Sequence, residues 1–142
     1  MKIKILITVA AGLFFTACNK DKFSTTPQLK FETVNADIFP RSSQIVMTLS
    51  ATDKEGDLKD TLWVERISKV CPDLNFVSPY ELVDFPKSKN LDIDFNVTYA
   101  YGTQLSGCSQ FDDSSYFRFW IKDDKENTSD TVESPLLVLL KQ

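Results

Sequence analysis

The sequence predicts an all-β domain, a two-sheet antiparallel sandwich of about seven strands, and three observations lead to it. Apolar residues recur at every second position in several separate segments, as expected of strands with one buried face. No segment carries a sustained apolar stripe at helical spacing. Polar turns join the alternating segments, which is typical of a sandwich. The chain of 142 residues, 42% of them hydrophobic, suits a single domain.

Alternation is clearest in two of the expected strands. Ile45, Met47 and Leu49 share one face of the first, and Leu91 begins a similar apolar series in the second. Pro135 marks the start or the edge of a last strand, because proline cannot donate to a sheet ladder. In chain order, the expected strands cover residues 28–34, 44–51, 61–70, 91–101, 117–121 and 136–140, with a short edge strand near Tyr80–Val83.

Two parts of this pattern are less regular. In strand 61–70 the inward face is either that of Leu62 and Val64 or that of Trp63 and Ile67. Residues 71–90 contain three prolines, yet they are too apolar for a solvated loop. We expect them to form a long irregular connection packed on the sandwich, with the edge strand inside it.

The composition excludes several classes of enzyme. The chain has no histidine, so serine–histidine and cysteine–histidine nucleophile pairs, histidine bases and the common zinc sites are absent. None of its four glycines stands in the spacing of a phosphate-binding loop. We therefore predict no catalytic residues, no required cofactor and no enzymatic activity.

The first residues have the features of an export signal. Lys2 and Lys4 precede an apolar run over residues 5–15, which is too short to cross a bilayer as a helix. The following Phe15-Thr16-Ala17-Cys18 resembles the lipobox of bacterial lipoproteins of the Bacteroidota type. That resemblance implies cleavage before Cys18 and a lipid on its thiol. The alternative is a plain signal peptide cut after Ala17.

The lipoprotein resemblance implies three regions: a signal peptide at 1–17, a lipidated flexible tether at 18–27 and the sandwich domain at 28–142. Cleavage removes two lysines, which takes the net charge from −4 to −6. Such a chain is not expected to bind nucleic acid, so the lipid would hold it at the outer membrane. Lys20-Asp21 resembles a surface-export signal, which favours the cell surface over the periplasmic leaflet. The oligomeric state stays open.

Two turns refine the fold. Residues 51–58 (ATDKEGDL) resemble the turn between the second and third strands of bacterial immunoglobulin-like and fibronectin type III-like repeats. Residues 121–130 resemble the hairpin between their last two strands, with Glu126 in place of the usual glycine. The resemblance implies an immunoglobulin-like sandwich over about 28–142, a fold that hosts many functions.

The three cysteines are explained by the same resemblance. Lipidation of Cys18 leaves Cys71 and Cys108, and an exported domain meets an oxidising compartment. We therefore predict a Cys71–Cys108 disulfide with a structural role.

Acidic residues are concentrated in the two turns, which the immunoglobulin-like topology places at one end of the sandwich. Clustered carboxylates repel one another unless they are hydrated or bridged, and Ca²⁺ prefers oxygen ligands. The alternative is ordinary turn formation, for which Asp and Gly are common residues. The candidate calcium ligands are Asp53, Glu55, Asp57, Asp123, Asp124 and Glu126.

Aromatic residues define a second candidate site. If Leu62 and Phe117 face inward, then Trp63, Tyr116, Arg118 and Trp120 share the outer face of one sheet, with a Glu65–Arg118 pair. Exposed apolar patches with polar rims mark binding sites for proteins or sugars. The alternative is that one tryptophan is in the core and residues 72–90 cover the other.

Two short motifs suggest covalent modification. Asp60-Thr61-Leu62 and Asp130-Thr131-Val132 resemble the O-glycosylation motif of Bacteroidota-type exported proteins, which would place sugars on Thr61 and Thr131. Taken together, we expect a membrane-anchored binding or accessory module whose partner is an envelope protein or a glycan. The alternative is a purely structural spacer or subunit of a larger surface complex.

Overall fold

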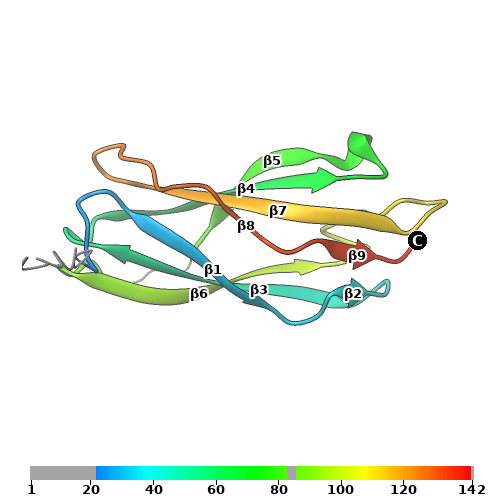
Figure 1. Cartoon of the computed structure of the whole chain (residues 1–142), viewed down its shortest axis with the longest axis horizontal. Helices are drawn as coiled ribbons and strands as arrows, with labels where there is room; N and C mark the ends of the chain where they lie inside the picture. Colours follow the sequence, from blue (N-terminus) through cyan, green and yellow to red (C-terminus); the bar gives the residue numbers. More distant parts are fainter. Residues whose placement is uncertain (1–21, 83–85, 142) are drawn as a thin grey trace, which may run out of the picture.

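A computed structural model describes residues 22–82 and 86–141. The expected signal peptide, Cys18 and the first part of the expected tether lie outside the described residues. The predicted all-β fold is confirmed: two sheets pack face to face as an immunoglobulin-like sandwich (Figure 1). In the described part, we find no helix with the length and apolar character needed to cross a membrane.

The sandwich has one narrow and one wide sheet. All pairings are antiparallel except that between β2 and β9. The narrow sheet has the order β1 (Gln28–Val34), β3 (Gln44–Asp53), β6 (Leu91–Ala100). The wide sheet has the order β2 (Ile38–Phe39), β9 (Leu137–Leu139), β7 (Asp113–Asp123), β4 (Leu58–Ser68), β5 (Phe76–Glu81), and β8 (Val132–Glu133) also pairs with β7.

The core lies between the sheets, and the predicted alternating residues supply much of it. Ile45, Met47 and Leu49 of β3 are fully buried against the inner face of the wide sheet. In β4 the inward side chains are those of Leu62 and Val64, which resolves the ambiguity in this strand and places Trp63 on the outside. Burial of apolar side chains, each contributing about 1.5–3 kcal/mol, therefore fixes the orientation of β4.

Residues 71–90 are more regular than the sequence suggests. After a short 3₁₀ helix at Pro72–Leu74, the chain forms β5, which begins four residues before the expected edge strand at Tyr80–Val83. β5 pairs with β4 and ends the wide sheet, so Pro79 is tolerated on an edge where no donor is needed. Residue 83 lies outside the described part of the chain.

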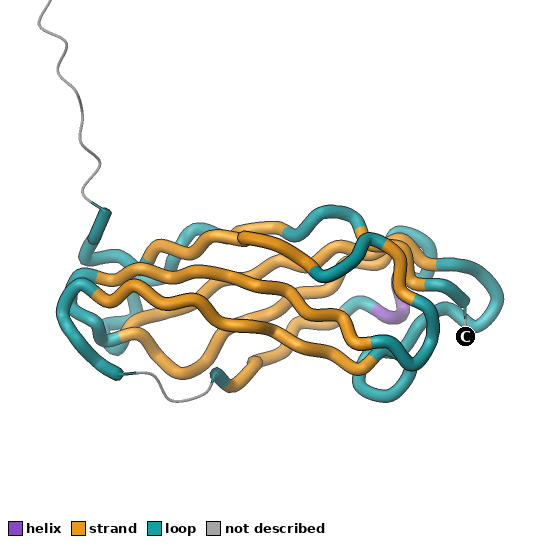
Figure 2. The backbone as a smooth tube through the Cα atoms, turned by 90° about the horizontal axis from the view of Figure 1, so that it is seen from below, coloured by secondary structure: helices purple, strands orange, loops and turns teal. Residues whose placement is uncertain are grey.

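The two resembled turns do lie together, at the end where the N-terminal segment enters the domain (Figure 2). The Asp124 amide donates to the Asp57 carbonyl at 2.9 Å, and the Lys54 amide donates to the Ser24 carbonyl at 3.0 Å. Glu126, which stands where the resembled hairpins have glycine, adopts a positive φ of 67°. The hairpin thus keeps the left-handed conformation without the residue that favours it.

At the other end of the sandwich, the predicted Cys71–Cys108 disulfide is present, with 6.1 Å between the Cα atoms. It joins the segment after β4 to the loop between β6 and β7. Closing a loop with a sequence separation of 37 removes about 4 kcal/mol of unfolded-state entropy in the chain-entropy model. The bridge is therefore a structural element of the domain.

A buried ionic network near this end was not predicted. Arg66 continues the inward series of β4 and is only 1% exposed. Its guanidinium donates to Asp113 at 2.8 Å, to Ser115 at 3.1 Å and to the Ser106 carbonyl at 2.5 Å. Asp113 also accepts bonds from the hydroxyls of Ser68 and Ser115. These hydrogen bonds outweigh desolvation by burial and hold the pKa of Asp113 below its usual range.

Candidate functional site

The outer face of the wide sheet brings together the four predicted aromatic and basic residues. In the β4–β7 register, Trp63 lies opposite Trp120, Glu65 opposite Arg118, and Ile67 opposite Tyr116. Because their neighbours in sequence point into the core, these side chains all point outward. We call Trp63, Glu65, Tyr116, Arg118 and Trp120 the outer aromatic face.

The two tryptophans of this face form a cross-strand pair. Their ring centroids are 6.3 Å apart and their planes differ by 7°. Both side chains are half-buried, so each indole keeps part of its surface in solvent. Such aromatic pairs contribute about 0.5–1.5 kcal/mol beyond the area they bury, which orders the rings before any partner arrives.

Charged groups are paired within the face. Arg118 Nε donates to Glu133 Oε1 at 2.7 Å, and its Nη1 lies 3.7 Å from Glu65 Oε2. The hydrogen bond that Arg118 donates to Glu133 is the main reason that the pKa of Arg118 is held above its usual range. The guanidinium also lies 5.5 Å from the ring centroid of Tyr116, and Lys69 lies 4.8 Å from the same ring.

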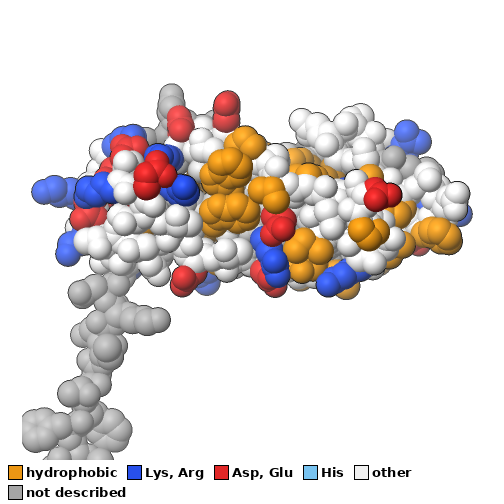
Figure 3. Space-filling model, turned by 90° about the horizontal axis from the view of Figure 1, so that it is seen from above, with side chains coloured by type: hydrophobic (Ala, Val, Ile, Leu, Met, Phe, Trp, Pro, Cys, Tyr) orange, Lys and Arg blue, Asp and Glu red, His pale blue; other side chains and the backbone are white. Residues whose placement is uncertain are grey.

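The rim of the face comes from β5, of which only the end overlaps the expected edge strand, and from β8, which was not expected. On β5, Pro79 lies opposite Trp63, and Val77 lies opposite Glu65 with 54% of its surface exposed. Glu133 comes from the two-residue strand β8. Figure 3 looks onto this face and shows apolar side chains gathered along its middle. The alternative, in which one tryptophan is in the core and residues 72–90 cover the other, is wrong. Both indoles lie on the outer face, and β5 lies beside β4 instead of over it.

The carboxylates at the N-terminal end fall into two groups. In the first, one carboxylate oxygen each from Asp53, Glu55 and Asp57 lies within 4.8 Å of the others. Asp53 is fully buried, and its Oδ2 accepts bonds from the amides of Gly56 at 2.6 Å and Asp57 at 3.2 Å. Burial nevertheless raises the pKa of Asp53, because desolvation outweighs these two bonds. We call these three residues the carboxylate cluster.

The other three predicted calcium ligands have partners of their own. Asp123 accepts the amides of Lys125 at 2.9 Å and Asn127 at 2.8 Å, so it serves the hairpin turn. Asp124 pairs with Lys87 at 3.1 Å. Glu126 pairs with two lysines, Lys59 and Lys122. The fold brings both turns together but leaves these three carboxylates outside the cluster.

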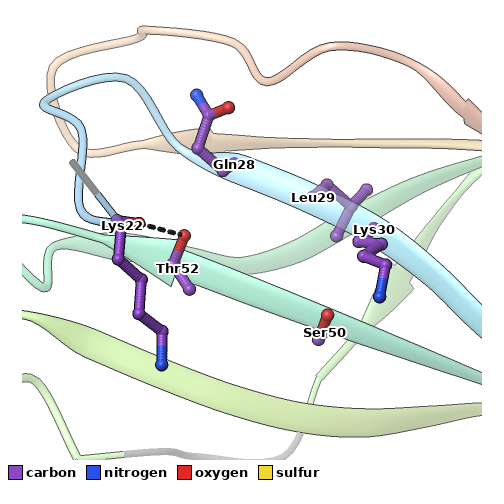
Figure 4. Close-up of a pocket in the computed structure, with 6 residues that line it drawn as sticks. All are labelled: Lys22, Gln28, Leu29, Lys30, Ser50 and Thr52. Atoms are coloured by element: carbon purple, nitrogen blue, oxygen red, sulfur yellow. Dashed lines mark hydrogen bonds between the residues drawn. The ribbon is translucent and has the colours of Figure 1, made fainter. Parts of the chain in front are cut away.

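Two of the hollows on the described surface lie away from the outer aromatic face and the carboxylate cluster. The one in Figure 4, of about 320 Å³, lies on the narrow sheet, where Lys22 and Lys30 flank Leu29, Ser50 and Thr52. Both lysines are paired with carboxylates, which leaves little free charge for an anion. The second, of about 350 Å³, lies between the edges of β5 and β6 and includes Tyr80, Leu82, Phe95 and polar neighbours. Neither contains a predicted site residue.

The predicted glycosylation sites differ in accessibility. Thr131 is exposed just before β8, whereas Thr61 is half-buried within β4, opposite Glu81. A modifying enzyme needs an exposed hydroxyl, so the structure favours Thr131 over Thr61 as the acceptor.

No protein-family model matches the chain, and comparison with curated proteins finds no match. Among solved structures, the sporulation control protein Spo0M from Bacillus subtilis has a TM-score of 0.50 at 8% identity, covering 82% of this chain and 50% of its own. A Niemann-Pick type C2 protein from Japanese carpenter ant has a TM-score of 0.47 at 15% identity, covering 80% of this chain and 94% of its own. The chain thus spans half the length of Spo0M, and that likeness shows the fold alone.

Proposed function

We propose that the protein is a lipid-anchored, non-enzymatic binding module of the outer membrane that docks on another envelope protein through the outer aromatic face. The anchor follows from the resemblance of residues 15–18 to a lipobox. The docking surface follows from one observation: Trp63 and Trp120 lie side by side, half-buried on the outside of the sheet and next to Arg118.

The composition and shape of the face favour a protein partner. Tryptophan, tyrosine and arginine are the residues that most often dominate the energy of protein interfaces. The face is the outside of a sheet, whereas small-molecule sites are concave. Its side chains are held by cross-strand contacts and by the bond between Arg118 and Glu133, which lowers the entropy lost on binding.

Two other functions use the same residues differently. Indole rings also stack on sugars, so a glycan is the second candidate ligand, favoured by the parallel ring planes of Trp63 and Trp120. In a purely structural spacer, the pair would contribute only to the stability of the sheet. The three candidates predict different crosslinking and fluorescence results.

Site-specific photocrosslinking in the cells that produce the full chain tests the protein partner. A photoreactive residue at Val77, on the rim of the face, should give one discrete protein adduct, and Trp120→Ala should abolish it. The matched control is Asn96, which is exposed on the narrow sheet and should give none. No adduct from Val77, or the same adduct from both positions, would overturn the proposal.

Tryptophan fluorescence detects a glycan bound to this face, because the chain has two tryptophans and both lie there. If a saccharide changes the tryptophan fluorescence and no protein adduct forms, the ligand of the face is a glycan and not a protein. If neither an adduct nor a fluorescence change is found, the structural spacer is the remaining function.

The lipid anchor is tested separately. Cys18→Ser should lose palmitate labelling and leave the membrane fraction, and a variant that stays membrane-bound would refute the anchor.

A further inference from the structure

The carboxylate cluster carries an inference that does not depend on the outer aromatic face. Asp53 is the last residue of β3, and Asp57 immediately precedes β4. The turn between them brings the carboxylates of Asp53, Glu55 and Asp57 to one point, with an oxygen of each within 4.8 Å of the other two. Gly56 allows this turn, since it adopts a φ of 71° and lies directly against the Ser88 carbonyl.

Three oxygens of the cluster are buried and accept no hydrogen bond from the described residues. They are Asp53 Oδ1, Glu55 Oε2 and Asp57 Oδ1. Asp53 is the most informative, because its whole side chain is buried and its other oxygen is already fixed by two backbone amides. Buried acceptors normally have partners, so three orphaned oxygens at one point indicate a missing donor or cation.

The charge of the cluster is also poorly balanced by the described residues. One lysine is near: Lys125 Nζ lies 3.8 Å from Asp57 Oδ2, on a side chain that is 61% exposed. A flexible surface lysine at this distance does not neutralise three carboxylates. By contrast, Asp124 and Glu126 on the adjacent turn have close lysine partners. The cluster therefore differs from its acidic neighbours in lacking both donors and counter-charge.

We infer that Asp53, Glu55 and Asp57 bind one Ca²⁺ ion. The donors are all hard carboxylate oxygens, which excludes the softer metals that prefer nitrogen or sulfur. Two oxygens bound to one Ca²⁺ can be at most about 4.6–5.2 Å apart, which is twice the Ca–O distance. The three oxygens of the cluster lie within 4.8 Å of one another, inside that limit. Ca²⁺ also accepts the irregular geometry of a turn, whereas Mg²⁺ demands a near-ideal octahedron and releases its waters reluctantly. Water would complete the coordination.

Calorimetry of the chelator-treated full chain in detergent, with CaCl₂ as the probe, tests this site. We expect saturable binding of one ion and a rise in melting temperature that MgCl₂ reproduces only weakly. Glu55→Gln should weaken Ca²⁺ binding by at least about tenfold, because ligand charge sets the affinity of calcium sites. The matched control is Glu126→Gln, an acid on the adjacent turn paired with lysines, which should bind Ca²⁺ like the unmodified domain.

The variant also has an expected effect without metal. Since Glu55 Oε2 accepts no bond from the described residues, Glu55→Gln should fold and should melt at the same or a higher temperature than the unmodified domain in chelator. Adding Ca²⁺ should reverse that order. An absence of heat and of any melting shift up to millimolar CaCl₂, or an equal response to MgCl₂, would overturn the inference. So would equal Ca²⁺ binding by Glu55→Gln.

Discussion

Replacing Arg66 by methionine should destabilise the domain far more than the same replacement of Arg118. Arg118 lies on the neighbouring strand of the same sheet and faces outward. Arg66 is buried and holds the charge of Asp113, whereas 38% of the Arg118 side chain is exposed. Removing one partner of a buried pair costs about 3–5 kcal/mol because the other charge stays buried. An exposed pair contributes at most about 1 kcal/mol.

Urea unfolding at pH 7, followed by tryptophan fluorescence, measures both losses. With a slope of about 1.5–2 kcal/mol per molar urea, Arg66→Met should lower the midpoint by about 1.5–3 M and Arg118→Met by about 0.5 M or less. Should Arg66→Met fail to fold, Arg66→Lys gives an intermediate loss, since lysine keeps the charge without the fork that reaches Ser115 and Asp113 together. Equal midpoints for the two methionine variants would refute the reasoning.

The pH dependence tests the cause of the loss. In the unmodified domain, the pKa of Asp113 is lowered, so its contribution is complete above the ordinary value near 4 and is lost as the pH falls through the lowered value. Without Arg66, the pKa of Asp113 should rise, because the bond and the charge of the guanidinium no longer lower it, and protonation in acid then relieves the buried charge. The stability difference between the unmodified domain and Arg66→Met should therefore narrow from pH 7 to pH 4. A stability difference that stays constant with pH would show that the charge of Asp113 does not cause the loss in Arg66→Met.

Three further predictions concern stability and titration. The Cys71→Ser/Cys108→Ser double variant should lose about 4 kcal/mol in urea unfolding, and a loss below about 1 kcal/mol would contradict the loop-closure account. Gly56→Ala should melt several degrees lower, because its Cβ would lie 1.8 Å from the Ser88 carbonyl oxygen at a φ of 71°; an unchanged melting temperature would show that the turn relaxes. Burial raises the pKa of Tyr99 to about 12, so the ultraviolet titration step that disappears in Tyr99→Phe should lie near pH 12. The contribution of Tyr99 to the free energy of unfolding should fall as the pH rises from 10 to 12, because only the unfolded chain loses the phenol proton in that range. A lost step near pH 10 would contradict this.

The strands with a buried face were predictable because alternation with period two is a local signal. The two-residue strands β2 and β8 have no such signal, since they form only by pairing with β9 and β7. Arg66 was not predicted for a related reason. A charge in an alternating strand indicates solvent, and its burial depends on Asp113, which is 47 residues away in sequence.

The candidate sites were predictable in outline and not in detail. The outward orientation of Trp63 and Trp120 followed once Leu62 was placed in the core. The edge strand was expected only from Tyr80 onward, so Val77 and Pro79, which supply the rim, were missed. Likewise, the topology predicted that the two acidic turns would meet. Which carboxylates remain unpaired depends on lysines such as Lys87, whose pairing with Asp124 only the folded chain shows.

The two proposed sites occupy different parts of the sandwich. They are related through the point at which the N-terminal segment joins the domain. The carboxylate cluster lies at the end where the N-terminal segment enters, and the Lys54 amide in the same turn bonds to Ser24. If Cys18 is lipidated as proposed, the chain from Cys18 to Ser24 spans six residue steps and reaches at most about 20 Å, so this end of the domain would stay near the bilayer. The outer aromatic face is carried by β4 and β7, which run along the length of the domain, on the side away from the narrow sheet. An ion in the cluster would stiffen the junction with the tether, and would thereby restrict the directions in which the face is presented without contacting the partner itself.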